Sequence, residues 1–232
     1  MATGHTLKAF DEDLDQLRAN IARMGGLAEA AIAGSMQALV RHDLEAARAV
    51  VEADKTIDSL EAEVERLAVQ IIALRAPMAN DLREVVAALK IAGVVERIGD
   101  YAKNIAKRVP GIESSRDLQP LSLLPEMARI AGAMVHDVLD AFVARDAVKA
   151  AEVCERDRAV DDFYNSIFRT LLTFMMEDPQ NITPATHLLF VAKNLERIGD
   201  HATNVAEMVH FAATGSHLAE RERGGDPSGA SR

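Results

Sequence analysis

The stretch ERIGDYAKNIA at residues 96–106 returns as ERIGDHATNVA at residues 196–206, and eight of the eleven positions are identical. A second pair of segments, RHDLEAARAVVEADKTID (41–58) and ARDAVKAAEVCERDRAVD (144–161), aligns at an offset of 103 residues. A repeat of about 100 residues is too long for a solenoid unit, which measures roughly 20–50 residues. The repeat therefore predicts a duplicated domain.

Both halves of the chain have the composition and the periodicity of helices. Ala, Leu, Glu and Arg, which are good helix formers, dominate them. Apolar residues recur at alternating steps of three and four, as in a helix with one buried face. Two such stripes are Ile91, Val95, Ile98, Ala102, Ile105 and Val109, and Leu188, Val191, Leu195, Ile198, Ala202, Val205 and Val209. The pattern predicts an all-α protein of two tandem, sequence-related, antiparallel three-helix bundles.

Capping residues and prolines mark the expected helix ends. Asp43 and Asp146 are placed to cap the second helix of each half, because an Asp side chain accepts bonds from the first free N–H groups. Pro77 and Pro179 each end a long helix. Thr183-Pro184 predicts an N-cap followed by proline at the first helical position of the last helix.

One internal stretch, PGIESSRDLQP at residues 110–120, has the composition of a linker. We therefore expect a first bundle at residues 1–112 and a second at residues 113–219. The tail at residues 220–232 is polar and rich in Gly, which predicts disorder.

Composition limits the classes of partner. The chain has 232 residues and a formal net charge of −10, which disfavours a nucleic-acid partner, since phosphate binding needs a basic surface. The single cysteine, Cys154, excludes an internal disulfide. The chain begins with no apolar signal region, and no uncharged apolar run approaches the ~20 residues of a membrane span. A cytoplasmic location is the expectation.

Acidic residues four apart occur twice in each repeat. On a helix, residues i and i+4 lie on one face, and like charges placed there repel by roughly 0.2–0.5 kcal/mol per pair. Four such pairs at matching positions require a compensating cation, either a basic side chain or a metal ion. The pairs are Asp54 and Asp58, Glu96 and Asp100, Asp157 and Asp161, and Glu196 and Asp200.

The spacing of these pairs predicts which carboxylates lie level in each helical hairpin. In an antiparallel hairpin, residues equidistant from the turn are neighbours. The midpoints of 54 with 100 and of 58 with 96 both fall on Pro77, the expected turn. The second-half midpoints fall beside Pro179. The predicted level pairs are Asp54 with Asp100, Asp58 with Glu96, Asp157 with Asp200, and Asp161 with Glu196.

Such a patch of carboxylates suits a hard cation, namely Mg²⁺, Ca²⁺, Mn²⁺ or oxidised iron. The third-helix carboxylates lie opposite the apolar stripe, so the expected site is shallow and open to water. A solvated acidic face neutralised by Arg97, Arg197 and Lys103 is the competing interpretation. Gly99 and Gly199, inside the motifs, are explained by close helix approach.

An enzyme is not expected from the motifs. The sequence contains no P-loop, no GxGxxG and no HExxH, and no set of nucleophile, base and orienting group can be assembled. The alternative that stays open is a metal-storing or metal-dependent helical-bundle enzyme. That alternative requires an enclosed, substrate-sized pocket at the metal.

The tandem motifs ERIGDYAKNIAKR and LERIGDHATNVAE resemble the ExxxD motifs of the PhoU family, accessory proteins of phosphate-specific transport. PMANDLREVVAALKIAGVVERIGD and HLLFVAKNLERIGDHATN also resemble that family's third and sixth helices, and the resemblance covers about residues 6–215. It implies two similar three-helix bundles whose carboxylates bind iron, zinc, manganese or magnesium. By position, the ligands fall on Glu96, Asp100, Glu196 and Asp200, and then on Asp54, Asp58, Asp157 and Asp161.

The resemblance also implies a role. Family members are negative regulators of the phosphate-starvation response and of phosphate uptake. The expected protein is a cytoplasmic homodimer that couples the ATPase of a phosphate ABC transporter to a sensor histidine kinase. One departure stands out, because the last helix opens NITPATHLL where the first repeat has MANDLRE. Asp81 and Arg83 therefore lack counterparts, and the two metal patches are expected to differ in occupancy.

Overall fold

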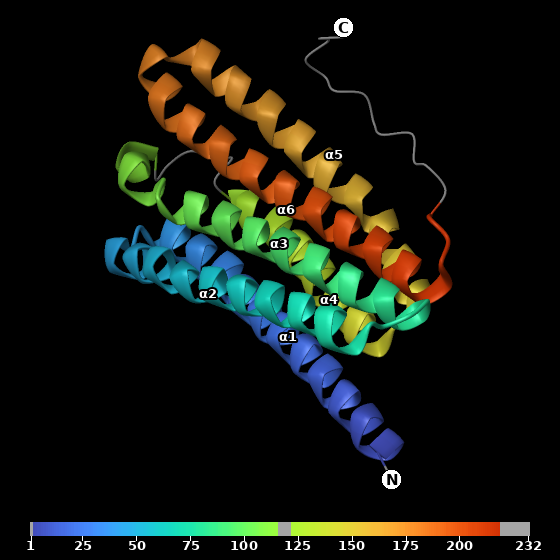
Figure 1. Cartoon of the computed structure of the whole chain (residues 1–232). Coiled ribbons are helices and arrows are strands. Elements are labelled where there is room, and N and C mark those ends of the chain that lie inside the picture. The colour runs from blue at the N-terminus through green and yellow to red at the C-terminus, as the bar shows by residue number, and fades with distance from the viewer. Residues whose placement is uncertain (1, 116–121, 219–232) are drawn as a thin grey trace, which may run out of the picture.

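The computed structural model describes residues 2–115 and 122–218, and within these ranges it contains six α-helices and no strand. Short 3₁₀ turns lie between α3 and α4 and between α5 and α6 (Figure 1). The helices are α1 (Ala2–Arg41), α2 (Leu44–Arg75), α3 (Asn80–Ala106), α4 (Leu124–Ala144), α5 (Ala147–Glu177) and α6 (Ile182–Thr214). The all-α prediction of three helices in each repeat is confirmed.

The helices form two layers. The order α2, α3, α6, α5 makes one layer, because α3 packs against both α2 and α6, and α6 packs against α5 (Figure 1). Helices α1 and α4 contact each other and cover one side of it. At the centre, the rings of Tyr101 and His201 meet edge to face, with centroids 5.0 Å apart. These two residues are repeat counterparts, so the repeats are related by an approximate two-fold axis between α3 and α6.

One continuous hydrophobic core joins the two repeats. The predicted stripes of α3 and α6 are buried along their length. The layer of α1 and α4 adds Leu17, Ile21 and Met134, each fully buried. Gly25 on α1 lies directly against the side chain of Leu139 on α4, where any Cβ would collide with it. This contact lets α1 and α4 approach closely across the boundary between the repeats.

Most helix ends lie at the capping residues and prolines that predict them. Asp43 accepts hydrogen bonds from the backbone N–H groups of Glu45 and Ala46, and Asp146 caps α5 in the same way. Helix α2 ends two residues before Pro77, and α5 ends at Glu177. The predicted start of α6 at Thr183-Pro184 is wrong, because the helix begins at Ile182 after a 3₁₀ turn at Pro179–Asn181. Pro184 falls in the first turn, where a missing N–H removes no helical bond.

The segment between the repeats is partly ordered. Val109–Ser115 form a 3₁₀ turn, so the first half of the predicted linker has regular structure. The rest of the linker and the predicted disordered tail at residues 220–232 lie outside the described residues. The domain limits 1–112 and 113–219 stay a prediction. None of the described helices combines the length and the apolar character that crossing a membrane requires.

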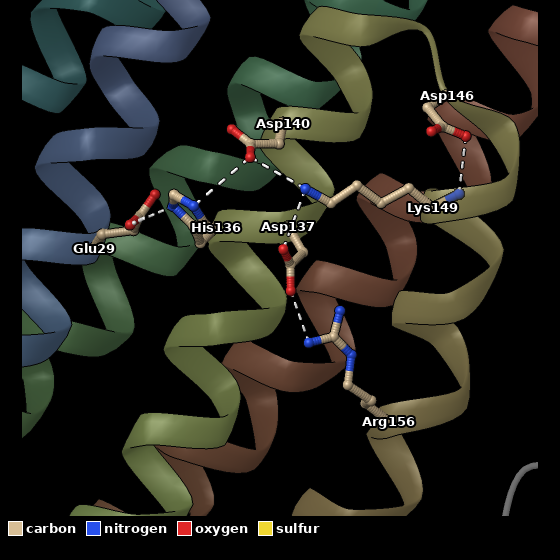
Figure 2. Close-up of polar contacts among 7 residues, drawn as sticks. All are labelled: Glu29, His136, Asp137, Asp140, Asp146, Lys149 and Arg156. Atoms are coloured by element: carbon tan, nitrogen blue, oxygen red, sulfur yellow. Dashed lines mark hydrogen bonds and ion pairs between the residues drawn. The ribbon is translucent and has the colours of Figure 1, made fainter.

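A polar network ties the second repeat to α1. Figure 2 shows His136 on α4 between two carboxylates, with its Nδ1 3.1 Å from Glu29 on α1. The next residue on α4 is Asp137, which contacts two cations of α5. It accepts a hydrogen bond from Arg156 at 2.7 Å and lies 3.2 Å from Lys149. Burial raises the pKa of Asp137, but these two cations outweigh it and hold the pKa below its ordinary value. The network therefore favours the charged carboxylate.

A second carboxylate between the repeats is Glu84 on α3, which is 8% exposed. Its Oε1 accepts from Arg18 Nε on α1 at 2.7 Å, and its Oε2 accepts from Arg145. Arg145 is the left-handed residue that ends α4, with φ of 54°. One carboxylate thus links α1 and α3 of the first repeat to the α4–α5 corner of the second.

We expect Glu84→Gln to lower the free energy of unfolding by about 1–3 kcal/mol, since it removes the charge that pairs both arginines. Urea denaturation monitored by circular dichroism measures the change. The matched control is Glu52→Gln, because Glu52 is 69% exposed and pairs with Lys55 on the surface. That substitution should change stability by less than about 0.5 kcal/mol. Equal effects of the two variants would contradict the linking role of Glu84.

Candidate functional site

The first-repeat cluster is organised around Lys103 on α3. Its Nζ donates to Asp100 Oδ1 at 2.5 Å, one turn earlier on the same helix, and also to Asp54 Oδ2 on α2. Asp54 and Asp100 therefore lie level across the hairpin, as the spacing about Pro77 predicts. The competing interpretation named Lys103 as a neutralising cation, and the structure confirms that contact.

Glycine in the motif sets the distance between the paired helices. A Cβ on Gly99 would lie 2.8 Å from Ile57 Cδ1 and 3.3 Å from Asp54 Oδ1, so the backbone of α3 touches side chains of α2. In the second repeat, a Cβ on Gly199 would lie 3.3 Å from Asp157 Oδ1. The close helix approach predicted at both glycines is confirmed, and the two hairpins share one register.

The third-helix glutamate of the first repeat has a neighbour that the sequence prediction missed. Burial, followed by the charge of Asp100, raises the pKa of Glu96, and Glu61 on α2 adds to the shift. Glu61 lies three residues after Asp58, so the two side chains are neighbours on the surface of α2. This spacing is the sequence signal that points to Glu61. Asp58 itself is exposed to solvent. Its predicted pairing with Glu96 stays a prediction.

The second-repeat cluster has a lysine in a different place. Lys193 Nζ donates to Glu196 Oε1 at 2.6 Å and sits 5.1 Å from the centre of the Tyr164 ring. Burial raises the pKa of Glu196, and the nearby charge of Asp200 raises it further despite the bond from Lys193. Asp157 and Asp161 are half-buried and Asp200 is exposed. The spacing of the acidic motifs predicts neither Lys193 nor Tyr164 as a member of the cluster.

Both clusters contain a carboxylate oxygen that is buried without a hydrogen bond. These oxygens are Asp54 Oδ1, on a side chain 5% exposed, and Glu196 Oε2, on a side chain 13% exposed. Both are hard ligands that a metal ion would accept. However, no three His, Cys, Asp or Glu side chains within residues 2–115 and 122–218 are arranged to hold an ion. The donor chemistry fits a metal, and binding one requires the carboxylates to turn toward it.

In the part of the chain that the structure describes, the carboxylate clusters lie outside the identified pocket. A surface pocket of about 240 Å³ is lined by Met36, Gln37, Val40, Arg41 and Pro125, near the end of α1 and the start of α4. None of the eight predicted ligands contributes to its wall.

The fold and the site define a class of protein, a duplicated three-helix bundle with an acidic ExxxD motif in the third helix of each repeat. The sequence model of the PhoU domain matches residues 21–109 and 124–209, so the chain belongs to the PhoU family. The resemblance drawn from the motifs is confirmed.

Similar proteins extend over nearly the whole chain. A Zymomonas mobilis protein described as a phosphate-specific transport system accessory protein PhoU homolog is 57% identical over 223 residues, covering 96% of this chain and 94% of that protein. A Caulobacter vibrioides protein with the same description is 50% identical over 217 residues, covering 93% of this chain and 94% of that protein. The crystal structure of PhoU from Pseudomonas aeruginosa matches with a TM-score of 0.86 at 35% identity, covering 89% of this chain and 100% of that one.

We expect Glu196→Gln to raise the melting temperature of the metal-free protein at pH 7 by about 1–3 °C. The pKa of Glu196 is raised above its ordinary value, so the charged form costs stability above the folded pKa. The gain should shrink as the pH falls toward the ordinary value of 4.5 and disappear below it, where the group is protonated in both states. Thermal melts of both proteins between pH 4.5 and pH 8 measure it.

The control for that experiment is Glu207→Gln, which removes the same charge from an exposed position on the same helix. Its effect should stay within about 1 °C across the series, as for an ordinary surface substitution. A Glu196→Gln variant that is less stable than the parent at pH 7 would show that the bond from Lys193 outweighs the desolvation of the carboxylate.

Proposed function

We propose that the chain is a phosphate-transport accessory protein and a negative regulator of the phosphate-starvation response and of phosphate uptake. The observation that carries the proposal is the PhoU-domain match in both repeats, together with relatives described as phosphate-specific transport system accessory proteins. The protein acts as a cytoplasmic adaptor. It couples the ATPase of the phosphate ABC transporter to a sensor histidine kinase.

The charge of the protein bears on how it reaches the membrane. A net charge of −10 gives no electrostatic attraction to anionic lipid. We therefore propose that the adaptor is recruited through protein contacts with the transporter and the kinase, as a homodimer. Long helical faces suit docking against the helices of a partner. The adaptor biases the kinase toward its phosphatase state, which requires different affinities for the two kinase states.

Metal binding is the second part of the proposal. The ExxxD carboxylates, helped by those of α2 and α5, bind iron, zinc, manganese or magnesium at the helix surface. The support is the oxygen-only donor set and the buried oxygens Asp54 Oδ1 and Glu196 Oε2, which accept no hydrogen bond. When bound, the ions supply positive charge to the clusters and offer open positions to a ligand from a partner.

Deleting the gene should switch on phosphate-starvation genes in cells grown in high phosphate, because the kinase loses the contact that holds it in the phosphatase state. A reporter fused to a starvation promoter measures this, and a plasmid copy of the gene should restore repression. Affinity capture from phosphate-replete cells should recover the transporter ATPase and the kinase. Normal repression in the deletion strain, with neither partner recovered, would contradict the adaptor role and favour the metal-storage alternative.

Metal should raise the melting temperature of chelator-stripped protein, because a ligand that binds the native state stabilises it by RT ln(1 + [L]/Kd). At 100 times Kd the gain is about 2.7 kcal/mol. Replacing all four third-helix ligands by their amides should abolish the gain and leave the helical content unchanged. Thermal melts with Mg²⁺, Mn²⁺, Zn²⁺ and Fe³⁺ test this, and identical melts with and without every ion would rule out the sites.

A further inference from the structure

The hairpins of the two repeats differ in the character of their outer surface. At three equivalent positions the first repeat has a charged residue and the second has an aromatic one. These pairs are Glu61 and Tyr164, Glu65 and Phe168, and Lys90 and Phe190. The α5–α6 hairpin therefore carries an apolar surface where the α2–α3 hairpin carries charges.

The packing of the helices confirms that these positions are equivalent. In the first repeat, a Cβ on Gly93 would lie 3.6 Å from Glu61 Oε1. In the second, Lys193 stands at the place of Gly93, and its Nζ lies 5.1 Å from the centre of the Tyr164 ring. The same two positions thus face each other in both hairpins, so the register is shared.

This register brings the apolar residues of α5 and α6 together. Phe168 and Leu189 are as far from the turn along their helices as one another, so they lie level across the hairpin. The Phe168 ring also lies 6.3 Å from the ring of Tyr164, one turn earlier on α5. Leu189 comes two residues before the buried Val191, which places it on the side of α6 opposite the core.

Much of this apolar surface is open to solvent. Leu172 is 42% exposed, Ile182 is 48% exposed, and Met176 beside the turn is 86% exposed. Phe190 is 47% exposed and extends the surface toward α3, where the Arg108 guanidinium lies 4.5 Å from its ring centre. A contiguous exposed apolar surface marks an interaction site, unlike apolar residues scattered singly. We call this surface the α5–α6 patch, and its residues are Phe168, Leu172, Met176, Ile182, Leu189 and Phe190.

Acidic residues flank the α5–α6 patch at both ends. Glu177 and Asp178, both exposed, lie at the turn. Asp161 and Glu196 lie at the other end, one turn beyond Tyr164 and Lys193. The hairpin as a whole is also acidic, since residues 157–200 contain seven Asp or Glu against four Lys or Arg. The patch thus offers apolar contact in the middle and negative charge at its ends.

We propose that the α5–α6 patch binds an amphipathic helix of a partner protein, one whose apolar stripe is flanked by Lys or Arg at both ends. An amphipathic helix that lays its apolar side on an apolar surface is a recurring mode of recognition. A second copy of the patch would bring acidic ends against acidic ends, and like charges across an interface repel. Anionic lipid is disfavoured for the same reason. The inference rests on the adaptor role proposed above and adds the surface and the chemistry of the partner.

The probe for this surface is a synthetic helical peptide of Leu and Lys, with Leu at alternating steps of three and four and Lys at both ends. Fluorescence anisotropy of the labelled peptide measures its Kd for the full chain. A peptide with Glu in place of every Lys should bind roughly tenfold more weakly or worse, because its charges meet the acidic ends of the patch.

The decisive variant is Phe168→Glu with Phe190→Lys, which installs the residues of the first repeat and leaves the net charge of the chain unchanged. It should weaken binding of the Leu-Lys peptide at least about tenfold, because the apolar contact is lost. The matched pair is Leu172→Ser, which should also weaken binding, and Val69→Ser, which should not. Val69 is the first-repeat counterpart of Leu172 and is 56% exposed. Circular dichroism checks each fold, and the matched pair decides the result if the double variant unfolds.

Three results would overturn the inference. The first is equal peptide binding by the parent chain and the double variant. The second is a parent dimer that becomes a monomer in the double variant during sedimentation velocity, which would assign the patch to a second copy. The third is binding to vesicles of phosphatidylglycerol and phosphatidylcholine that the double variant loses, which would assign the patch to a membrane.

Partner capture separates this inference from the adaptor role. In phosphate-replete cells the double variant should recover less of the transporter ATPase or of the kinase than the parent chain does, and Val69→Ser should recover both as the parent does. Full recovery of both partners by the double variant would overturn the inference and leave the adaptor role in place. If the parent chain recovers neither partner, the adaptor role fails, and the peptide titration still decides whether the patch binds a basic amphipathic helix.

Discussion

The close antiparallel contact between α2 and α3, repeated between α5 and α6, determines where the cluster carboxylates lie. Gly99 has no side chain, so the α3 backbone approaches until Ile57 and Asp54 of α2 lie against it. A larger residue would push the helices apart and expose Asp54 to water. The price of the approach is desolvation, because Asp54 is left 4% exposed within the contact. A buried carboxylate requires a nearby cation. The close packing of the helices is therefore the reason that the site needs a positive charge.

The two repeats supply this positive charge from different positions. In the first repeat Lys103 lies between the two aspartates, and Glu61 and Gly93 occupy the next turns toward the hairpin end. In the second, Tyr164 stands at the place of Glu61 and Lys193 at the place of Gly93, and the two interact through the aromatic ring. The first-repeat lysine contacts two aspartates, and the second-repeat lysine contacts Glu196. The register of the paired helices is the same in both repeats. The two clusters therefore differ because individual side chains differ.

Sequence spacing predicted the helices and the level of Asp54 with Asp100, because both follow from fixed geometry. The helical rise and the turn at Pro77 determine which residues lie level. Spacing could not select between Asp58 and Glu61, which are neighbours on the surface of α2. The start of α6 was misplaced because Thr183-Pro184 has capping chemistry, while the 3₁₀ turn before it depends on Asp178 accepting from Gln180. The contacts of Lys103 and Lys193 depend on the rotamers of their side chains. The periodicity of the sequence does not predict these rotamers.

The two-layer arrangement bears on how one partner could contact both clusters. Helices α1 and α4 cover one side of the layer, and the buried stripes of α3 and α6 face that side. Glu96 and Glu196 lie opposite those stripes, so both clusters open on the uncovered side. Between them, Asp100 and Asp200 directly precede Tyr101 and His201, whose rings meet at the approximate two-fold axis. A partner surface laid across α3 and α6 therefore meets two acidic clusters that are related by the fold but neutralised by different cations.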